Sequence, residues 1–257
     1  YFAYIISGFL AEPDWQAVGE AMVKPQIEFS TPYLMLLIGM IGTTITPWMQ
    51  FYLQASVVEK GIKIENYKYT KIDVAVGAVI AGLVAFFIIV ASAATLFKHG
   101  VVIEDASQAA MALEPLVGRF AEILFAIGLL NASILGAMIV PLATSFYICE
   151  GLGFEPGVNK TFKEAPWFYG IFTALIILGA IPALFPGTPL IKVMLTAQVV
   201  NGILLPPVLI FIVLLINKKW LMGEHVNKRW HNIVAWFTVI VLIALSAVLA
   251  LSGMGMI

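Results

Sequence analysis

The chain of 257 residues is 61% hydrophobic and only 11% charged, with a formal net charge of −1. Soluble domains carry about 25% charged residues, so this composition, with a mean hydropathy of +0.99, excludes an ordinary soluble domain. It predicts an all-α polytopic membrane protein embedded in a lipid bilayer, and we expect no nucleic-acid partner. The single cysteine, Cys149, excludes an internal disulfide and any multi-cysteine metal site.

Apolar runs predict a partial helix followed by six full spans, each near the roughly 20 residues that cross a bilayer. The chain begins inside an apolar run, without an initiator methionine, so we expect a fragment that starts within a helix. Asp105 is expected to cap a short amphipathic helix ahead of the third full span. We expect residues 1–257 to form a single transmembrane domain, with the partial helix at 1–10 and spans at about 32–58, 72–97, 118–149, 167–185, 190–217 and 231–252.

The first full span contains a helix-breaking sequence in its middle, Gly42-Thr43-Thr44-Ile45-Thr46-Pro47. Pro47 cannot donate a main-chain hydrogen bond, and its ring crowds the carbonyl of Thr43 four residues earlier. In lipid, such a break persists only where it is buried in protein or lines a wet cavity. We therefore expect residues 43–47 to be non-helical or distorted and to face a cavity shared with Gln198. Released carbonyls and hydroxyls would form an oxygen-rich cation site, unless the hydroxyls bond back to the helix's own carbonyls.

The fifth full span carries two carboxamides, Gln198 and Asn201, which are three residues apart and therefore share one helix face. Asn201 could shape the same cavity as Gln198, although joining neighbouring helices by hydrogen bonds is the more common role of such residues, and we expect that role for Asn131. Pro206-Pro207 would bend or loosen the fifth span. We expect close packing at most of the glycines within the spans, which are Gly8, Gly39, Gly42, Gly77, Gly82, Gly136 and Gly202.

The positive charges predict the orientation of the chain in the membrane. Loops 59–71, 150–166 and 218–230 carry ten of the 14 Lys and Arg residues, so we expect these loops to be cytoplasmic in a multi-pass protein of the cell inner (plasma) membrane. The acidic loop residues, including Glu104 and Glu114, are then expected outside, where ordinary solvation explains them better than cation capture.

The predicted membrane interior lacks ionisable residues: every Asp and Glu lies in a loop or close to a span end. Transporters of ions or protons usually keep an ionisable residue within the membrane. Neutral oxygens alone cannot offset the lost hydration of a divalent cation, so we expect a carboxylate from outside this chain. An enzyme is not expected, because no nucleophile–base pair or metal-ligand cluster lies at membrane depth.

Several short segments match motifs of one transporter family, in the same order. They are Ala11-Glu12-Pro13-Asp14-Trp15, Ile103-Glu104-Asp105-Ala106-Ser107-Gln108, Leu113-Glu114-Pro115-Leu116-Val117-Gly118, Leu124-Phe125-Ala126-Ile127-Gly128-Leu129-Leu130 and Ala197-Gln198-Val199-Val200. With them the chain resembles the C-terminal half of an Nramp-family divalent-metal transporter along nearly its whole length. The resemblance implies a LeuT-like inverted-repeat fold, of which this chain covers late helix five to helix eleven.

In the family, the metal lies between breaks in helices one and six. The helix-one D-P-G-N motif is absent from this chain, so the resemblance implies the N-terminal half of the same transporter, its first five helices, as a partner. The helix-six motif A-T-V-M-P-H-N matches residues 43–49. Thr43 then takes the carbonyl position, Thr46 the methionine position and Trp48 the first histidine position, with Gln54 near the second. The implied metal residues are Thr43, Thr46 and Gln198, and the cavity-shaping residues are Thr44, Pro47, Trp48, Met49 and Asn201.

Replacement of the family methionine by Thr46 changes the expected metal. Thioether sulfur favours transition metals, whereas hydroxyl and carbonyl oxygens suit Mg²⁺, Ca²⁺ and Mn²⁺. Threonine also leaves room for water, which Mg²⁺ gives up reluctantly. The pattern resembles the Nramp-related magnesium transporters. We therefore expect secondary transport of Mg²⁺, with Mn²⁺ as a further cargo, by alternating access and without a cofactor. The alternatives are a carrier of amino acids or other organic solutes with the same fold, and a non-transporting sensor or scaffold subunit.

Overall fold

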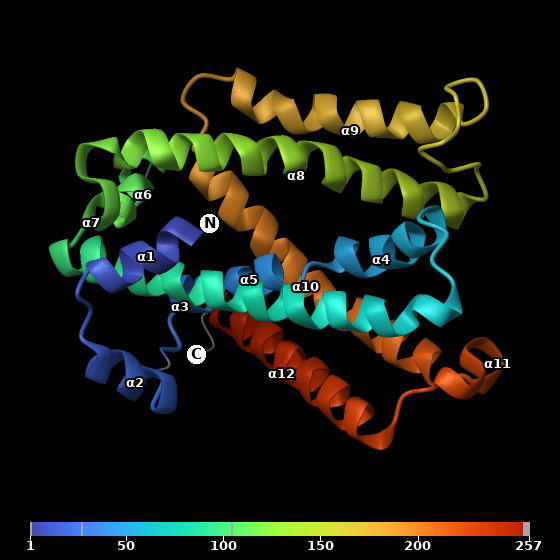
Figure 1. Ribbon diagram of the computed structural model, residues 1–257, viewed down its shortest axis with the longest axis horizontal. Helices are drawn as coiled ribbons and strands as arrows, with labels where there is room; N and C mark the ends of the chain where they lie inside the picture. The colour runs from blue at the N-terminus through green and yellow to red at the C-terminus, as the bar shows by residue number, and fades with distance from the viewer. Residues whose placement is uncertain (1, 27, 104, 254–257) are drawn as a thin grey trace. The chain divides into compact units, whose positions relative to one another are not determined.

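The computed structural model describes residues 2–26, 28–103 and 105–253, and its regular elements within these ranges are all helical. Within the same ranges, five short 3-10 turns, η1 to η5, lie beside some of the helices, and Figure 1 shows how the helices follow one another along the chain. The helices are α1 Phe2–Leu10, α2 Trp15–Val23, α3 Thr31–Thr44, α4 Pro47–Glu59, α5 Tyr67–Thr95, α6 Ala106–Ala109, α7 Glu114–Val117, α8 Ala121–Leu152, α9 Pro166–Leu184, α10 Leu190–Ile216, α11 Lys219–Met222 and α12 Arg229–Gly253.

Among the described residues, six helical runs are long and apolar enough to cross a membrane, as expected for a polytopic all-α membrane protein. Most of their ends lie within a few residues of the expected spans. The second begins at residue 64 rather than 72, and the third begins at 106 rather than 118, because short helical turns precede α5 and α8. The runs are Thr31–Glu59, Ile64–His99, Ala106–Leu152, Pro166–Leu184, Leu190–Ile216 and Arg229–Leu249.

Two aspartates cap short helices. Asp105 caps α6 as predicted: its side chain accepts a hydrogen bond from the Ser107 amide at 2.8 Å, and the Gln108 side chain completes a capping box. Only the first turn is α-helical, and the chain continues as the 3-10 turn η3 (Ala110–Leu113) and then α7. Asp14 caps α2, a helix that the sequence analysis did not predict. Glu104, expected on the external side, lies outside the described residues.

The chain packs as two compact units, which are described separately. The first covers residues 1–26 and 55–178. Here α1 lies along α5, with the rings of Phe9 and Phe87 5.0 Å apart, and the buried Ser7 hydroxyl donates to the Ala112 carbonyl at 2.6 Å. Helix α8 contacts the start of α9 through Phe146 and Phe168, whose rings are 4.8 Å apart. Cys149 is fully buried as a small core residue, as expected.

The second unit covers residues 27–54 and 179–257, and α10 packs against both α3 and α12. Its core is formed by Leu34 and Ile38 of α3, Val199 of α10 and Leu249 of α12. Helix α10 runs through Pro206 and Pro207 without interruption, so the two prolines do not divide it. This unit contains every predicted site residue.

Candidate functional site

The helix break predicted in the first full span is confirmed, and it is narrower than expected. Helix α3 continues to Thr44, Ile45 has non-helical dihedrals (φ −123°, ψ 85°), and α4 begins at Pro47. The Ile45 amide still donates to the Ile41 carbonyl at 2.9 Å. Pro47 has no N–H, so it cannot supply the donor that a continuous helix would give to the Thr43 carbonyl. Thr43 and Thr44 are nevertheless part of α3, so the break consists of Ile45 and Thr46 alone.

Thr46 has the most unusual environment of the three threonines. Its residue surface is only 6% exposed, and its hydroxyl has no hydrogen-bond partner among the described residues. By contrast, the Thr44 hydroxyl donates to the Met40 carbonyl at 2.7 Å, which is the ordinary back-bond to the same helix. Buried polar atoms are nearly always hydrogen-bonded, and an exception calls for an explanation such as water, an ion or a further segment.

Two glycines hold the last turn of α3 directly against α10. A Cβ atom added at Gly42 would clash with the Gln198 carbonyl and lie 2.5 Å from the Gly202 amide nitrogen. A Cβ atom added at Gly202 would lie 2.5 Å from the Ile38 carbonyl oxygen. Only glycine permits this main-chain contact, which is the small-residue packing typical of membrane helices. The contact brings Gln198 to the turn of α3 that immediately precedes the break.

The close-packing role expected of seven glycines is confirmed for Gly8, Gly39, Gly42 and Gly202, because each has atoms of another helix within 4 Å of an added Cβ. The prediction that most of the seven are close-packing positions is therefore confirmed, and the other three have no such contact within the described part of the chain. Nothing outside their own helices lies within 4 Å of an added Cβ at Gly77, Gly82 and Gly136.

The two carboxamides of α10 are joined to each other. The Asn201 side chain donates to the Gln198 side-chain oxygen at 3.1 Å, and both residues are partly buried. This bond lies within one helix, so it is not the interhelical bond that we considered for Asn201. It holds the Gln198 carboxamide and leaves one lone pair of its oxygen available to a ligand.

Two further carbonyls beside Gln198 lose their usual donors. In a helix, the carbonyls of Gly202 and Ile203 would accept from residues 206 and 207, which are prolines without an N–H. The carbonyls of Gly202 and Ile203 on α10 are therefore further neutral oxygen atoms of the second unit, in addition to those of Thr43 and Thr46. Hydroxyl, carbonyl and carboxamide oxygens are ligands for hard cations such as Mg²⁺ and Ca²⁺.

The other predicted site residues occupy varied positions. Pro47 is buried, and Trp48 is half-buried with its ring 6.5 Å from that of Tyr52. Thr43, Thr44 and Met49 are exposed, so no other part of the described chain covers them. Their roles around a shared cavity remain predictions.

Charged ligands are not gathered anywhere in the described ranges. Within residues 2–26, 28–103 and 105–253, no group of three or more His, Cys, Asp and Glu residues could hold a metal ion. The residues predicted to bind the metal, Thr43, Thr46 and Gln198, therefore supply dipoles and no negative charge, and their role as ligands remains a prediction.

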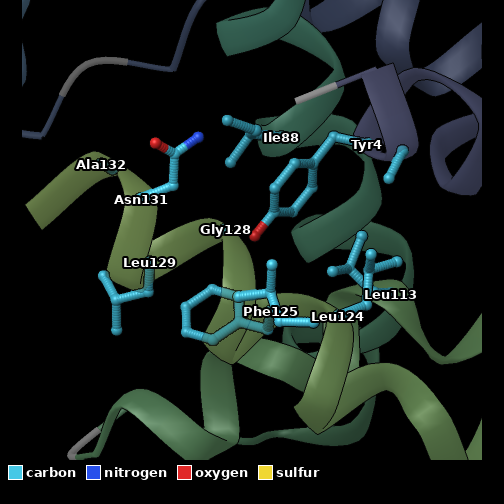
Figure 2. Close-up of a pocket in the computed structure, with 11 residues that line it drawn as sticks. Tyr4, Ile88, Leu113, Leu124, Phe125, Gly128, Leu129, Asn131 and Ala132 are labelled. Carbon is cyan, nitrogen blue, oxygen red and sulfur yellow. The ribbon is translucent and has the colours of Figure 1, made fainter. Parts of the chain in front are cut away.

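The first unit contains a separate pocket of about 290 Å³ between α1, α5 and α8 (Figure 2). Its lining is mostly apolar, and Figure 2 shows the Tyr4 hydroxyl directed towards Gly128, with the Asn131 carboxamide at the pocket edge. Asn131 is exposed on the described chain, so the interhelical role that we expected for it is not formed with a described helix. No predicted metal residue lines this pocket.

Comparison with known proteins gives one family and a consistent set of relatives. The family model described as "Natural resistance-associated macrophage protein-like", Nramp, matches residues 1–252. A divalent metal cation transporter MntH of Clostridium acetobutylicum is 27% identical over 254 residues, which cover 96% of this chain and 56% of that protein. Proteins of the same description from Pectobacterium carotovorum and Yersinia pestis are 26% and 27% identical, and each is covered to 59% of its length. The chain thus spans a little over half the length of these curated relatives.

Proposed function

Because the chain belongs to the Nramp family, we propose that it forms part of a membrane transporter for a divalent metal cation, with Mg²⁺ as the preferred ion and Mn²⁺ as a second cargo. The similar proteins are described as divalent metal cation transporters. The family has the LeuT-like fold, and the long apolar helices of this chain agree with it. In this proposal the protein is a carrier that works by alternating access, and not an enzyme.

The observation that carries the proposal is the buried Thr46 hydroxyl without a partner at the break between α3 and α4. A hydroxyl buried without a hydrogen bond costs stability, and a cation or its bound water would satisfy it. The Thr43 carbonyl and the Gln198 carboxamide supply further neutral oxygens in the proposed ligand set. Hard oxygens with space for retained water favour Mg²⁺ over thioether-seeking metals.

The negative charge that a divalent cation needs is assigned in this proposal to the N-terminal half of the transporter. The longer relatives have the length for such a half, and the family resemblance places an aspartate in its first helix. The residues of this chain then orient the ion and set its selectivity, while the carboxylate supplies most of the binding energy.

Uptake of Mg²⁺ into proteoliposomes containing the complete transporter tests this function. Thr46→Val removes the hydroxyl and keeps the side-chain shape, and we expect it to weaken Mg²⁺ uptake about tenfold or more. The matched control is Thr238→Val in α12, whose hydroxyl donates to the Val234 carbonyl at 3.0 Å, and it should transport normally. Wild-type vesicles that carry amino acids but no divalent cation would favour an organic-solute carrier. Vesicles that carry neither would indicate a sensor or scaffold.

We propose further that loops 59–71, 150–166 and 218–230 face the cytoplasm of a cell with this protein in its inner membrane. Ten of the 14 Lys and Arg residues lie in these loops, as the positive-inside rule requires. Single cysteines introduced at Lys63 and at Glu114, in a background lacking other cysteines, should react differently with an impermeant maleimide applied to intact cells. The proposed orientation predicts labelling at position 114 and protection at position 63. The opposite result would show that the loops face the other side of the membrane.

A further inference from the structure

The connection between α10 and α12 is tied together by three asparagines. Asn217 at the end of α10 and Asn232 at the start of α12 exchange two hydrogen bonds, of 2.8 Å and 2.7 Å, through their carboxamides. Asn227 donates to the same Asn232 oxygen at 3.1 Å, and Asn217 also donates to the Val213 carbonyl at 2.7 Å. Helix α11 lies within this connection (Figure 1). The two helix ends are therefore held at a defined separation.

A recess of about 320 Å³ opens where these helix ends meet. It is lined by three residues with large apolar groups, Val213, Leu214 and Trp236, and by three polar residues, Asn217, Lys218 and Asn232. All six residues belong to the second unit. The apolar groups belong to the membrane-spanning runs of α10 and α12, while Lys218 lies just beyond the end of α10. The recess is thus amphipathic and lies where the membrane-spanning runs of α10 and α12 end or begin.

The connection that contains Lys218 of the recess is strongly cationic in sequence. Lys218, Lys219, Lys228 and Arg229 lie within twelve residues of one another, and Glu224 is the one acidic residue of that segment. None of the four cations forms an ion pair with a described acidic residue. Two tryptophans of the same connection, Trp220 and Trp230, are 80% and 69% exposed. Exposed tryptophan beside Lys and Arg at the end of membrane helices is the chemistry of the lipid headgroup layer.

We propose that the recess between the ends of α10 and α12 binds an anionic phospholipid of the surrounding membrane. Lys218 and the neighbouring cations contact the phosphate, the remaining N–H of the Asn232 carboxamide donates to a headgroup oxygen, and Leu214 and Trp236 contact the upper part of an acyl chain. A soluble anion would use only the polar side of the recess. A nucleic acid or an acidic protein would gain nothing from apolar groups that lie within membrane-spanning runs.

Native mass spectrometry of the purified full-length protein in neutral detergent tests the site. The protein is titrated with dioleoylphosphatidylglycerol and with dioleoylphosphatidylcholine, which has the same chains on a headgroup without net charge. We expect phosphatidylglycerol to bind at least about tenfold more tightly. Lys218→Gln should weaken phosphatidylglycerol binding about fivefold, the effect expected for one cation near an anionic surface. Conversion of Lys218, Lys219, Lys228 and Arg229 together to glutamine should abolish the preference for phosphatidylglycerol.

The matched control removes the same number of charges from another basic loop, by converting Lys60, Lys63, Lys68 and Lys71 to glutamine. This loop lies in the first unit, and its lysines do not line the recess. The control variant should keep the tight phosphatidylglycerol site. Leu214→Trp fills the apolar side without changing charge and should weaken both lipids. If the fourfold variant does not fold, Lys218→Gln and Leu214→Trp decide the question.

Three results would overturn the proposal. The first is equal binding of the two lipids by the wild-type protein. The second is an equal loss of phosphatidylglycerol binding in the recess variants and in the control variant, which would indicate general charge attraction. The third is full displacement of phosphatidylglycerol by millimolar inorganic phosphate, which would identify an anion site without lipid specificity.

Discussion

At the scale of single residues, we expect the Thr46 hydroxyl to lower the stability of the metal-free protein and to support Mg²⁺ transport. Its buried hydroxyl has no partner among the described residues, and such a group costs about 1–3 kcal/mol. Thr46→Val should therefore raise the free energy of unfolding in metal-free detergent solution, while it lowers Mg²⁺ transport. The measurement is chemical or thermal unfolding of the purified protein.

Thr238→Val is the comparison for that experiment. It removes a hydroxyl that is already bonded to its own helix, so it should leave stability unchanged or lower it by about 0.5–1.5 kcal/mol. A clear loss of stability in Thr46→Val would mean that the hydroxyl has a permanent partner in the complete transporter, and its role as a free ligand would be wrong.

The metal preference should change when a sulfur is placed at the same position. Thr46→Met supplies a soft ligand and fills space that retained water would occupy, so Mg²⁺ binding should weaken and Cd²⁺ or Mn²⁺ binding should strengthen. A change of about 1.4 kcal/mol shifts the relative affinity tenfold. Competition of Mg²⁺ against Cd²⁺ in wild type and variant measures it. An active variant with an unchanged ratio would remove Thr46 from the metal site.

Glu164 lies outside the membrane spans, and the stability of the loop around it is expected to depend on pH. Its carboxylate accepts hydrogen bonds from the Thr161 amide at 2.6 Å and from the Thr161 hydroxyl at 2.8 Å, and these bonds lower the pKa of Glu164. A lowered pKa means that the stabilisation is present above the ordinary carboxyl range and is lost as the pH falls through the lowered value. Glu164→Gln should speed amide hydrogen exchange around Thr161 at neutral pH.

The difference in exchange between Glu164→Gln and wild type should shrink in acid, once the wild-type carboxylate is protonated. Glu155→Gln serves as the control, because Glu155 contacts the Lys160 side chain and not the main chain. The same difference at neutral and at acid pH would show that the hydrogen bonds to Thr161 do not depend on the charge.

The residues of the α3–α4 break show which parts of the site could be predicted from the sequence and which could not. The pattern of threonines and Pro47 predicted a break, but three threonines were equally plausible as its polar groups. Which hydroxyl is buried depends on the residue at which the helix stops, and that is set by packing against α10. The contact between Gln198 and Gly42 has no local sequence signal, since it joins segments more than 150 residues apart.

At the scale of helices, the α3–α10 contact should tolerate no added methyl group. A Cβ at Gly42 clashes with main-chain atoms of α10, and overpacking of this kind costs about 1–3 kcal/mol. Gly42→Ala should therefore lower stability and transport together. Gly77→Ala in α5 is the matched control, because nothing outside its own helix lies within 4 Å of the added atom. Alanine there should be neutral or stabilise the helix by about 0.5–1 kcal/mol. Equal effects of the two substitutions in thermal unfolding would contradict the close contact.

Helix existence was predicted better than helix continuity. A membrane-spanning helix can be recognised from the length of its apolar run. Whether a proline interrupts a helix depends on the structure around it. Pro47 coincides with a break, but Pro206 and Pro207 lie within the continuous helix α10. Helix α2 was missed because nine residues of mixed polarity carry little signal. Its one marker was Asp14, the residue that caps it.

At the scale of the whole molecule, composition was sufficient to predict a polytopic all-α membrane protein, and ordered motifs were sufficient to place it in a family. The division into two packing units could not be predicted, because it depends on which spans touch. The identity of the metal cannot be predicted from the composition of this chain either, since the charged ligands are expected in helix one of the complete transporter.

Metal transport is expected to proceed without a coupled proton. No Asp, Glu or His lies deep within a span of this chain, and Trp48 and Gln54 stand at the positions of the family histidines. Internal pH should therefore stay constant during Mg²⁺ uptake into proteoliposomes that carry a pH-sensitive dye. Acidification in proportion to metal flux would contradict this and would indicate a proton acceptor elsewhere in the transporter.

The contact between Gly42 and Gly202 also restricts how the second unit can move. Helices separated by long side chains can slide past each other through small rotamer changes, but at Gly42 and Gly202 main-chain atoms of the two helices lie directly against each other. We therefore expect helices α3 and α10 to move together as one rigid body. The neighbouring joint at Ile45 and Thr46 is then the hinge about which α4 can swing. A cation held by Thr46 lies on that hinge, so its arrival and departure can bias the swing directly.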